Sequence, residues 1–115
     1  EEDEPPAPAG PGDWSFVPHV IESSHPYENH TSRSWSIQAP EGATEMRLHF
    51  ERVDLESGYD FLSLRGESGD KLAEWTGDQG SVVSATHPGS RLQLNLFTDY
   101  SVTQWGFRLS GYSWR

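Results

Sequence analysis

Three acidic residues and one tyrosine are the side chains whose types and positions could do chemistry together: Glu56, Asp60, Asp99 and Tyr27. They lie in segments that we expect to meet at one end of a small β domain. Carboxylates of like charge do not gather without cause, because each raises the cost of ionising the next. Such a cluster is typical of a site for a hard cation such as calcium. The sequence therefore predicts a metal site. The alternative is that Asp60 and Asp99 only shape turns, Asp99 with Ser101.

Catalysis is not expected from this sequence. Its histidines show no spacing typical of zinc ligands: His19, His25, His30, His49 and His87. The stretch 66–69 (Gly-Glu-Ser-Gly) is the nearest approach to a serine nucleophile elbow, and a turn between strands explains it better. Paired acids can hydrolyse glycosides, but 115 residues leave little room for a substrate cleft beside the core.

Length, charge and composition narrow the function classes. A chain of 115 residues forms one domain. The net charge of −10, with only eight Lys and Arg, argues against nucleic acid and favours cations or basic proteins as partners. No apolar run approaches the roughly 20 residues of a membrane span, so no membrane association is expected. With five Trp, five Phe and four Tyr, we expect an aromatic-rich core in which the tryptophans are buried.

The N-terminal stretch has a different composition from the rest. Residues 1–13 are acidic, contain four Pro and two Gly and lack large apolar side chains, which predicts an extended linker joined to something larger. Order is expected to begin near Trp14, so that residues 14–115 form the domain. The triplet from Asn29 to Thr31 matches the N-glycosylation pattern, but such triplets arise often by chance, so glycosylation of Asn29 stays open.

Seven short runs alternate apolar and polar residues, and Gly, Pro, Ser and Asp separate them. The predicted strands cover residues 34–37, 46–50, 61–64, 71–75, 81–84, 91–96 and 106–109. Short strands at this spacing, without a helical period, predict an all-β fold built as an antiparallel β-sandwich.

Several motifs in this order resemble the CUB domain family over residues 20–112. The matching segments are 21–27 (IESSHPY), 35–37 (WSI), 39–42 (APEG), 50–56 (FERVDLE), 58–62 (GYDFL), 94–101 (LNLFTDYS) and 106–109 (GFRL). The resemblance implies a jelly-roll β-sandwich of a secreted, extracellular protein.

The resemblance also implies a ligand set. In calcium-binding members of the family, positions that correspond to Glu56, Asp60 and Asp99 supply carboxylate ligands, and a Tyr corresponding to Tyr27 supports the Glu. The backbone carbonyl of Ser101 would be a further ligand, with water completing the six to eight oxygens that calcium prefers.

This sequence departs from the family pattern in three ways. Many members have an Asn shortly after the Asp99 turn, whereas Val102 and Thr103 stand here, so one ligand is expected to be missing and the affinity to be modest. The two disulfides usual in the family are absent, because the chain has no cysteine. The connection from Glu56 to Asp60 is also shorter than usual. A cysteine-free sequence resembles the bacterial branch, where bound calcium would supply part of the missing stability.

The expected function is a non-catalytic, calcium-binding recognition module of a secreted multidomain protein, with a protease as one candidate parent. It would bind a protein partner through a Lys or Arg, with Tyr59 and Tyr100 as candidate contact residues. Two alternatives stay open: a carbohydrate-binding module with exposed aromatics near the same loops, and a structural or dimerisation domain. The partner and the oligomeric state are not determined by the sequence.

Overall fold

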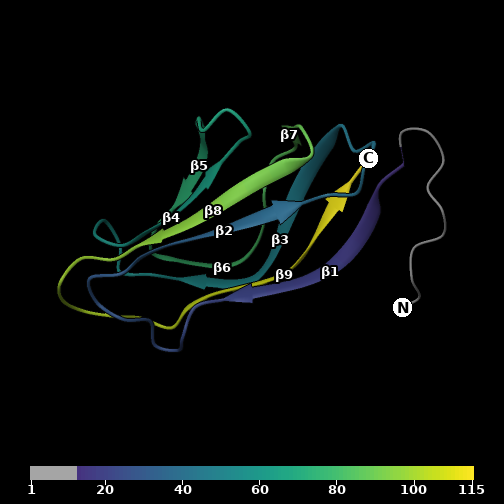
Figure 1. Cartoon of the computed structure of the whole chain (residues 1–115). Helices are drawn as coiled ribbons and strands as arrows, with labels where there is room; N and C mark the ends of the chain where they lie inside the picture. Colours follow the sequence, from purple (N-terminus) through teal and green to yellow (C-terminus); the bar gives the residue numbers. More distant parts are fainter. Residues whose placement is uncertain (1–12) are drawn as a thin grey trace.

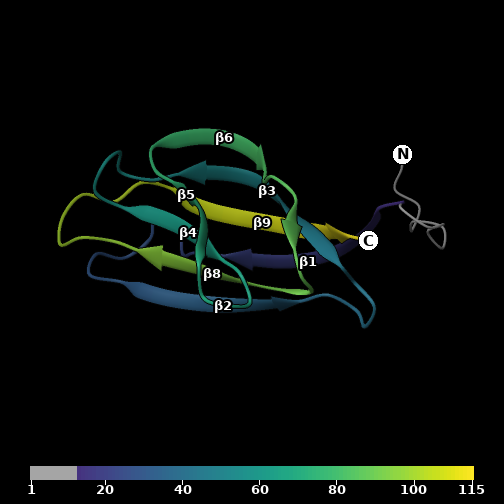
Figure 2. The ribbon, with the colours of Figure 1, turned by 90° about the horizontal axis from the view of Figure 1, so that it is seen from above.

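Two antiparallel sheets pack face to face in the computed structural model of the chain, which describes residues 13–115 (Figure 1). The first sheet has the order β1-β9-β3-β6, with β7 beside β3, and the second has the order β2-β8-β4-β5 (Figure 2). The bounds are β1 Ser15–Glu22, β2 Ser32–Gln38, β3 Glu45–Asp54, β4 Phe61–Arg65, β5 Lys71–Trp75, β6 Asp78–Val83, β7 His87–Pro88, β8 Arg91–Phe97 and β9 Gly106–Trp114. The predicted antiparallel sandwich is confirmed. Of the predicted linker, residues 1–12 lie outside the described part.

The core between the sheets is mainly aliphatic rather than aromatic. Of the 17 buried hydrophobic residues in the described part, eight are Leu and four are aromatic. On β8, Leu92, Leu94 and Leu96 alternate with exposed or half-buried neighbours, as the two-residue period of a strand requires. All five tryptophans are half-buried, and they lie around the edge of the core or on the surface. The expectation of an aromatic-rich core with buried tryptophans was therefore wrong, because aliphatic side chains, with leucine the most frequent, supply most of the buried hydrophobic residues.

Two strands are longer than the alternation predicted, because bulges interrupt it. The pairing of β3 with β9 shifts register between Phe50 and Arg52, so that Glu51 and Arg52 are both exposed while Phe50 and Val53 are both buried. A bulge places two consecutive residues opposite one and changes which face the next side chain occupies. The strand therefore continues to Asp54, although the period of two breaks at its middle.

Strands β1 and β7 were not predicted from the sequence. Strand β1 is at the edge of its sheet, contains Pro18 and buries only Ile21 fully. A proline is tolerated on an edge strand because no neighbour needs its missing N–H. Strand β7 has two residues, too few for any alternation to show.

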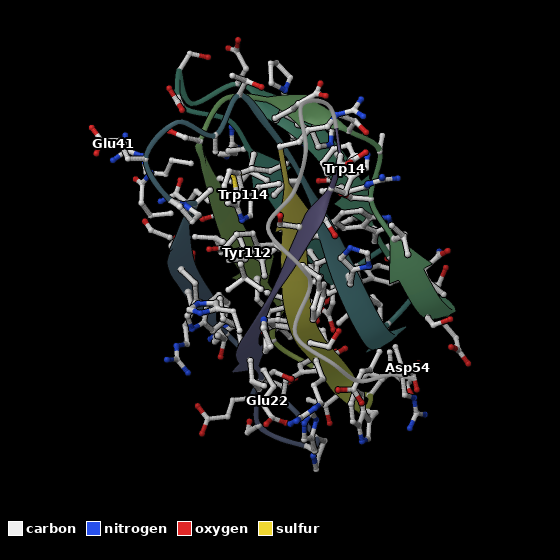
Figure 3. All side chains as sticks on the ribbon, turned by 90° about the vertical axis from the view of Figure 1, so that its right-hand side faces the viewer. Trp14, Glu22, Glu41, Asp54, Tyr112 and Trp114 are labelled. Atoms are coloured by element: carbon white, nitrogen blue, oxygen red, sulfur yellow. The ribbon has the colours of Figure 1, made fainter. Side chains whose placement is uncertain are left out.

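Next to the start of β1, two arginines contact the ring of Trp14. The guanidinium groups of Arg47 and Arg115 are 3.9 and 4.4 Å from its ring centroid. Figure 3 shows Trp14 and Trp114 in its upper half, well away from Glu22 and Asp54.

The connections β1–β2, β3–β4 and β8–β9 converge at the opposite end of the sandwich from the C-terminus (Figure 1). They carry Tyr27, Glu56, Asp60 and Asp99. The antiparallel arrangement thus brings residues up to 72 positions apart to one edge. In the described part of the chain, no helix is long and apolar enough to cross a membrane.

Candidate metal centre

Three carboxylates meet at this end of the sandwich. Glu56 and Asp60 lie between β3 and β4, and Asp99 lies between β8 and β9. Each offers a carboxylate oxygen, and these oxygens all lie within 4.8 Å of one another. The structure therefore brings together the three acids that the sequence singled out.

Asp60 is completely buried, and both of its oxygens accept hydrogen bonds. Oδ2 accepts one from the Tyr27 hydroxyl at 2.5 Å, and Oδ1 accepts one from the backbone N–H of Asp99 at 2.8 Å. A buried carboxylate is tolerated only with such partners. Asp60 thus joins the loop after β3 to the loop after β8.

Glu56 carries the unsatisfied atom of the site. Its Oε1 is buried and has no hydrogen-bond partner in the described part of the chain. Burial raises the pKa of this carboxyl, and the nearby charges of Asp99 and Asp60 raise it further. A buried oxygen without a donor is costly, and a cation among the three carboxylates would satisfy it. The donor set consists only of hard oxygen atoms, as calcium requires.

Tyr27 connects the two acids of the β3–β4 loop. Its hydroxyl donates to Asp60 and accepts a hydrogen bond from the backbone N–H of Glu56 at 3.0 Å. The pKa of this buried phenol is raised, first by burial and then by the hydrogen bond to Asp60. Tyr27 thus contacts both acids directly, and its role in supporting a bound metal stays a prediction.

Thr76, which the sequence did not point to, forms hydrogen bonds with the turn between Glu56 and Asp60. Its Oγ1 accepts a hydrogen bond from the N–H of Gly58 at 2.9 Å and lies 2.8 Å from the carbonyl oxygen of Asp60. A lone Thr after a strand has no sequence signal for this role, because its partners are 16 and 18 residues away.

The loop after β8 follows a strained path beyond Asp99. The backbone N–H of Ser101 donates to Oδ1 of Asp99 at 3.2 Å, which is the Asx turn considered as an alternative to a ligand role. Val102 has φ of 65°, a region that β-branched residues rarely adopt. The turn and the acidic cluster coexist, so one does not exclude the other. A ligand role for the Ser101 carbonyl stays a prediction.

Two tyrosines next to the acids are exposed. Tyr59 is 60% and Tyr100 75% exposed. The ring of His30 contacts Tyr100 edge-on at 6.0 Å between centroids. Large exposed aromatic side chains of this kind are typical of contact surfaces. Their role in binding a partner stays a prediction.

The remaining acids make other contacts. Asp54 pairs with Arg52 at 3.1 Å and Glu51 with Arg108 at 2.8 Å, while Asp70 accepts a hydrogen bond from Ser68. None of them belongs to the carboxylate cluster among the described residues. These three acids therefore lie outside the candidate metal centre.

Comparison with known proteins gives a sequence-family match and several relatives. The sequence model of the CUB domain matches residues 19–110. Exoskeleton protein RP43 of Riftia pachyptila is 36% identical over 91 residues, which cover 72% of this chain and 21% of that protein. E3 ubiquitin-protein ligase HERC2 of Homo sapiens is 32% identical over 110 residues, which cover 88% of this chain and 2% of that protein. The chain thus spans about a fifth of one relative and a small fraction of the other.

Solved structures share the fold. The CUB1-EGF-CUB2 domain of human MASP-1/3 superimposes with a TM-score of 0.69 at 24% identity, covering 84% of this chain and 40% of that chain. The MASP-1 CUB2 domain bound to Ca²⁺ superimposes with a TM-score of 0.60 at 24% identity, covering 81% of this chain and 88% of that one. These likenesses show that the chain shares the sandwich fold.

Proposed function

Because this chain belongs to the CUB domain family, we propose that it is a non-catalytic recognition module that binds calcium through Glu56, Asp60 and Asp99. The observation that carries the proposal is the buried, unpartnered Oε1 of Glu56 within a cluster of three carboxylates. Without a cation, this arrangement combines like-charge repulsion with an unsatisfied buried acceptor. With calcium, both costs are removed.

Calcium takes six to eight oxygen ligands, so the three carboxylates need further oxygen atoms to complete the coordination. We assign the Ser101 carbonyl and water to this role. Because the expected Asn ligand is replaced by Val102 and Thr103, the affinity should be modest. Tyr27 supports the site through Asp60 and the backbone of Glu56.

The partner that fits this edge is a protein that presents a Lys or Arg. The chain carries a net charge of −10, and the carboxylates are flanked by the exposed Tyr59 and Tyr100. A cationic side chain would form charge-assisted hydrogen bonds with the acids, while its aliphatic part packs on the tyrosines. CUB domains are typically extracellular, and we place this module in a secreted multidomain protein.

Calorimetric titration with calcium tests the metal site. The wild type should bind one calcium ion per chain, and Asp99→Asn should lose most of this binding while keeping its backbone hydrogen bond to Asp60. The matched control is Asp70→Asn, which removes an exposed charge on the β4–β5 turn and should bind calcium as the wild type does. Equal binding by wild type and Asp99→Asn would contradict the assignment.

A separate experiment tests the partner: NMR signals of Tyr59 and Tyr100 are followed while Nα-acetyl-lysine amide, whose side-chain amine is free and charged, is added. The signals should move in calcium and not in chelator. If only the signals of residues far from the three acids move, the partner binds a different surface.

A further inference from the structure

The outer face of the second sheet carries a groove that the proposed calcium site does not use. We call it the sheet groove. It has a volume of about 420 Å³, within the range of small-molecule sites. Its lining comes from all four strands of the sheet and includes both positively and negatively charged side chains.

Strand register arranges these residues in rows across the sheet. Asn95 lies opposite Ser34 on one side and Ser63 on the other, and Ser63 lies opposite Glu74. Small serines therefore flank the longer amide. Because directly opposed side chains are only about 5 Å apart, the short serines beside Asn95 leave a depression in the middle of the sheet face.

The next row adds a second amide and two cations. Gln93 lies opposite Ser36 and Arg65, and Arg65 lies opposite Lys71. At the other end, Phe97 lies opposite Phe61, which places two aromatic residues beside the polar rows.

The polar groups of the groove keep unused hydrogen-bonding capacity. Asn95 accepts a hydrogen bond from Ser34 through Oδ1 at 2.5 Å, which leaves its amide N–H₂ group for another partner. Glu74 receives Lys71 at 3.0 Å and Ser63 at 3.3 Å on the same oxygen, Oε2, which leaves Oε1. Donors and acceptors thus lie side by side. A hydroxyl group, which both donates and accepts, matches such a surface.

Charge indicates a neutral ligand. Lys71 and Glu74 neutralise each other, and Arg65 already donates to the carbonyl oxygen of Gly69 at 3.0 Å. An anionic ligand would be repelled by Glu74, and a cationic one by Lys71 and Arg65, so the groove as a whole matches neither sign of charge. A neutral polar ligand meets neither penalty.

The aromatic end of the groove continues into a second hollow. That hollow, of about 440 Å³, shares Ser32 and Phe97 with the sheet groove and extends to Tyr100. Phe97 is 53% exposed and lies at the junction. An apolar ring beside amides and a carboxylate suits the two kinds of surface on a sugar, its C–H face and its hydroxyls.

We propose that the sheet groove binds a neutral oligosaccharide, with Phe97 as the platform for one sugar ring and Asn95, Gln93 and Glu74 as partners of its hydroxyls. This site differs from stacking at the loops, because most of its polar contacts come from the sheet face. It does not depend on calcium.

The test is calorimetric titration of the chain with cellohexaose, mannohexaose, xylohexaose, maltohexaose and chitohexaose, each in calcium and in chelator. At least one should bind saturably and with equal affinity in both buffers. The variants Asn95→Ala and Phe97→Ala should each weaken that binding by about tenfold or more, as expected for the loss of one buried polar or stacking contact. Gln93→Leu is a further variant on the same face, and it should act in the same direction.

The matched control is Val83→Ala, which shortens an exposed side chain on β6 of the other sheet and should leave sugar binding unchanged. The comparison of binding in calcium and in chelator separates this site from the calcium site. Absence of saturable binding for all five sugars, binding that Asn95→Ala and Phe97→Ala do not weaken, or binding that chelator abolishes would each overturn the proposal.

Discussion

The hydroxyl of Tyr27 lies 2.5 Å from Oδ2 of the buried Asp60 and also accepts a hydrogen bond from the backbone N–H of Glu56. One side chain from the β1–β2 connection therefore orders both acids of the β3–β4 loop. Because Asp60 in turn accepts the N–H of Asp99, the three acids are positioned through direct hydrogen bonds.

Tyr27→Phe should destabilise the domain and weaken calcium binding together. It leaves Oδ2 of Asp60 and the N–H of Glu56 without a partner, at a cost of about 1–3 kcal/mol. Urea denaturation in chelator measures the free energy of unfolding, and calorimetry measures the calcium affinity. Tyr59→Phe, at an exposed hydroxyl, is the control and should change neither. An unchanged unfolding free energy for Tyr27→Phe would contradict the bridging role.

Asp99→Asn should have opposite effects on stability in chelator and in calcium. In chelator it removes one negative charge beside Glu56 and Asp60, so the melting temperature should rise. In calcium the wild type gains about 2.7 kcal/mol when calcium is at 100 times Kd, and the variant should lose this gain. Thermal melts of both proteins in both buffers give the four values. If the substitution shifts the melting temperature equally in both buffers, the charge of residue 99 affects stability but not through calcium binding.

Thr76→Val should loosen the turn from Glu56 to Asp60. The substitution keeps the shape but removes the oxygen that accepts the N–H of Gly58, so the unfolding free energy should fall by about 1–2 kcal/mol. Denaturant unfolding measures the loss, and hydrogen exchange of Gly58 should accelerate. Thr103→Val is the control. If Gly58 remains protected in Thr76→Val, the turn is held by other contacts.

Val102→Asn should stabilise the loop after β8. The residue has φ of 65°, which costs a β-branched side chain about 1–2 kcal/mol and an Asn less. Melts in chelator measure this effect without a contribution from calcium, and the melting temperature should rise. Thr103→Asn, one residue further and outside the left-handed region, provides the comparison. A lower melting temperature for Val102→Asn would show that packing of Val102 outweighs its backbone strain.

Stability should fall as the pH drops below about 6.5, the ordinary pKa of histidine. Burial lowers the pKa of His87, and the pKa of His49 is lowered by burial and by the charge of Arg47. A lowered histidine pKa means that the unfolded chain takes up the proton more readily, so stability is complete above the unfolded pKa and is lost on acidification.

His87→Leu should reduce this pH dependence, because it removes a titrating group whose Nε2 is buried without a partner in the described part of the chain. The exposed His19 offers His19→Gln as the control. Chemical denaturation between about pH 7.5 and about pH 5 gives the slopes. Identical slopes for wild type and His87→Leu would assign the effect to other groups.

Most of the sandwich could be predicted from local sequence. Each of the seven predicted strands is present, because alternation and turn formers are local properties of the chain. The two missed strands and the extensions of β3 and β9 depend on edge position and bulges, which are set by the neighbouring strand.

The sequence by itself determined the family, the sandwich and the identity of the three acids, because ordered motifs and the charge of a side chain are readable along the chain. Only the tertiary structure decided that Tyr27 joins Asp60 to Glu56, that Thr76 holds the turn, that leucines fill the core and that Asn95 and Phe97 share a groove. These contacts join residues far apart in sequence. Their geometry depends on strand register and packing, in which a shift of one residue moves every side chain to the other face.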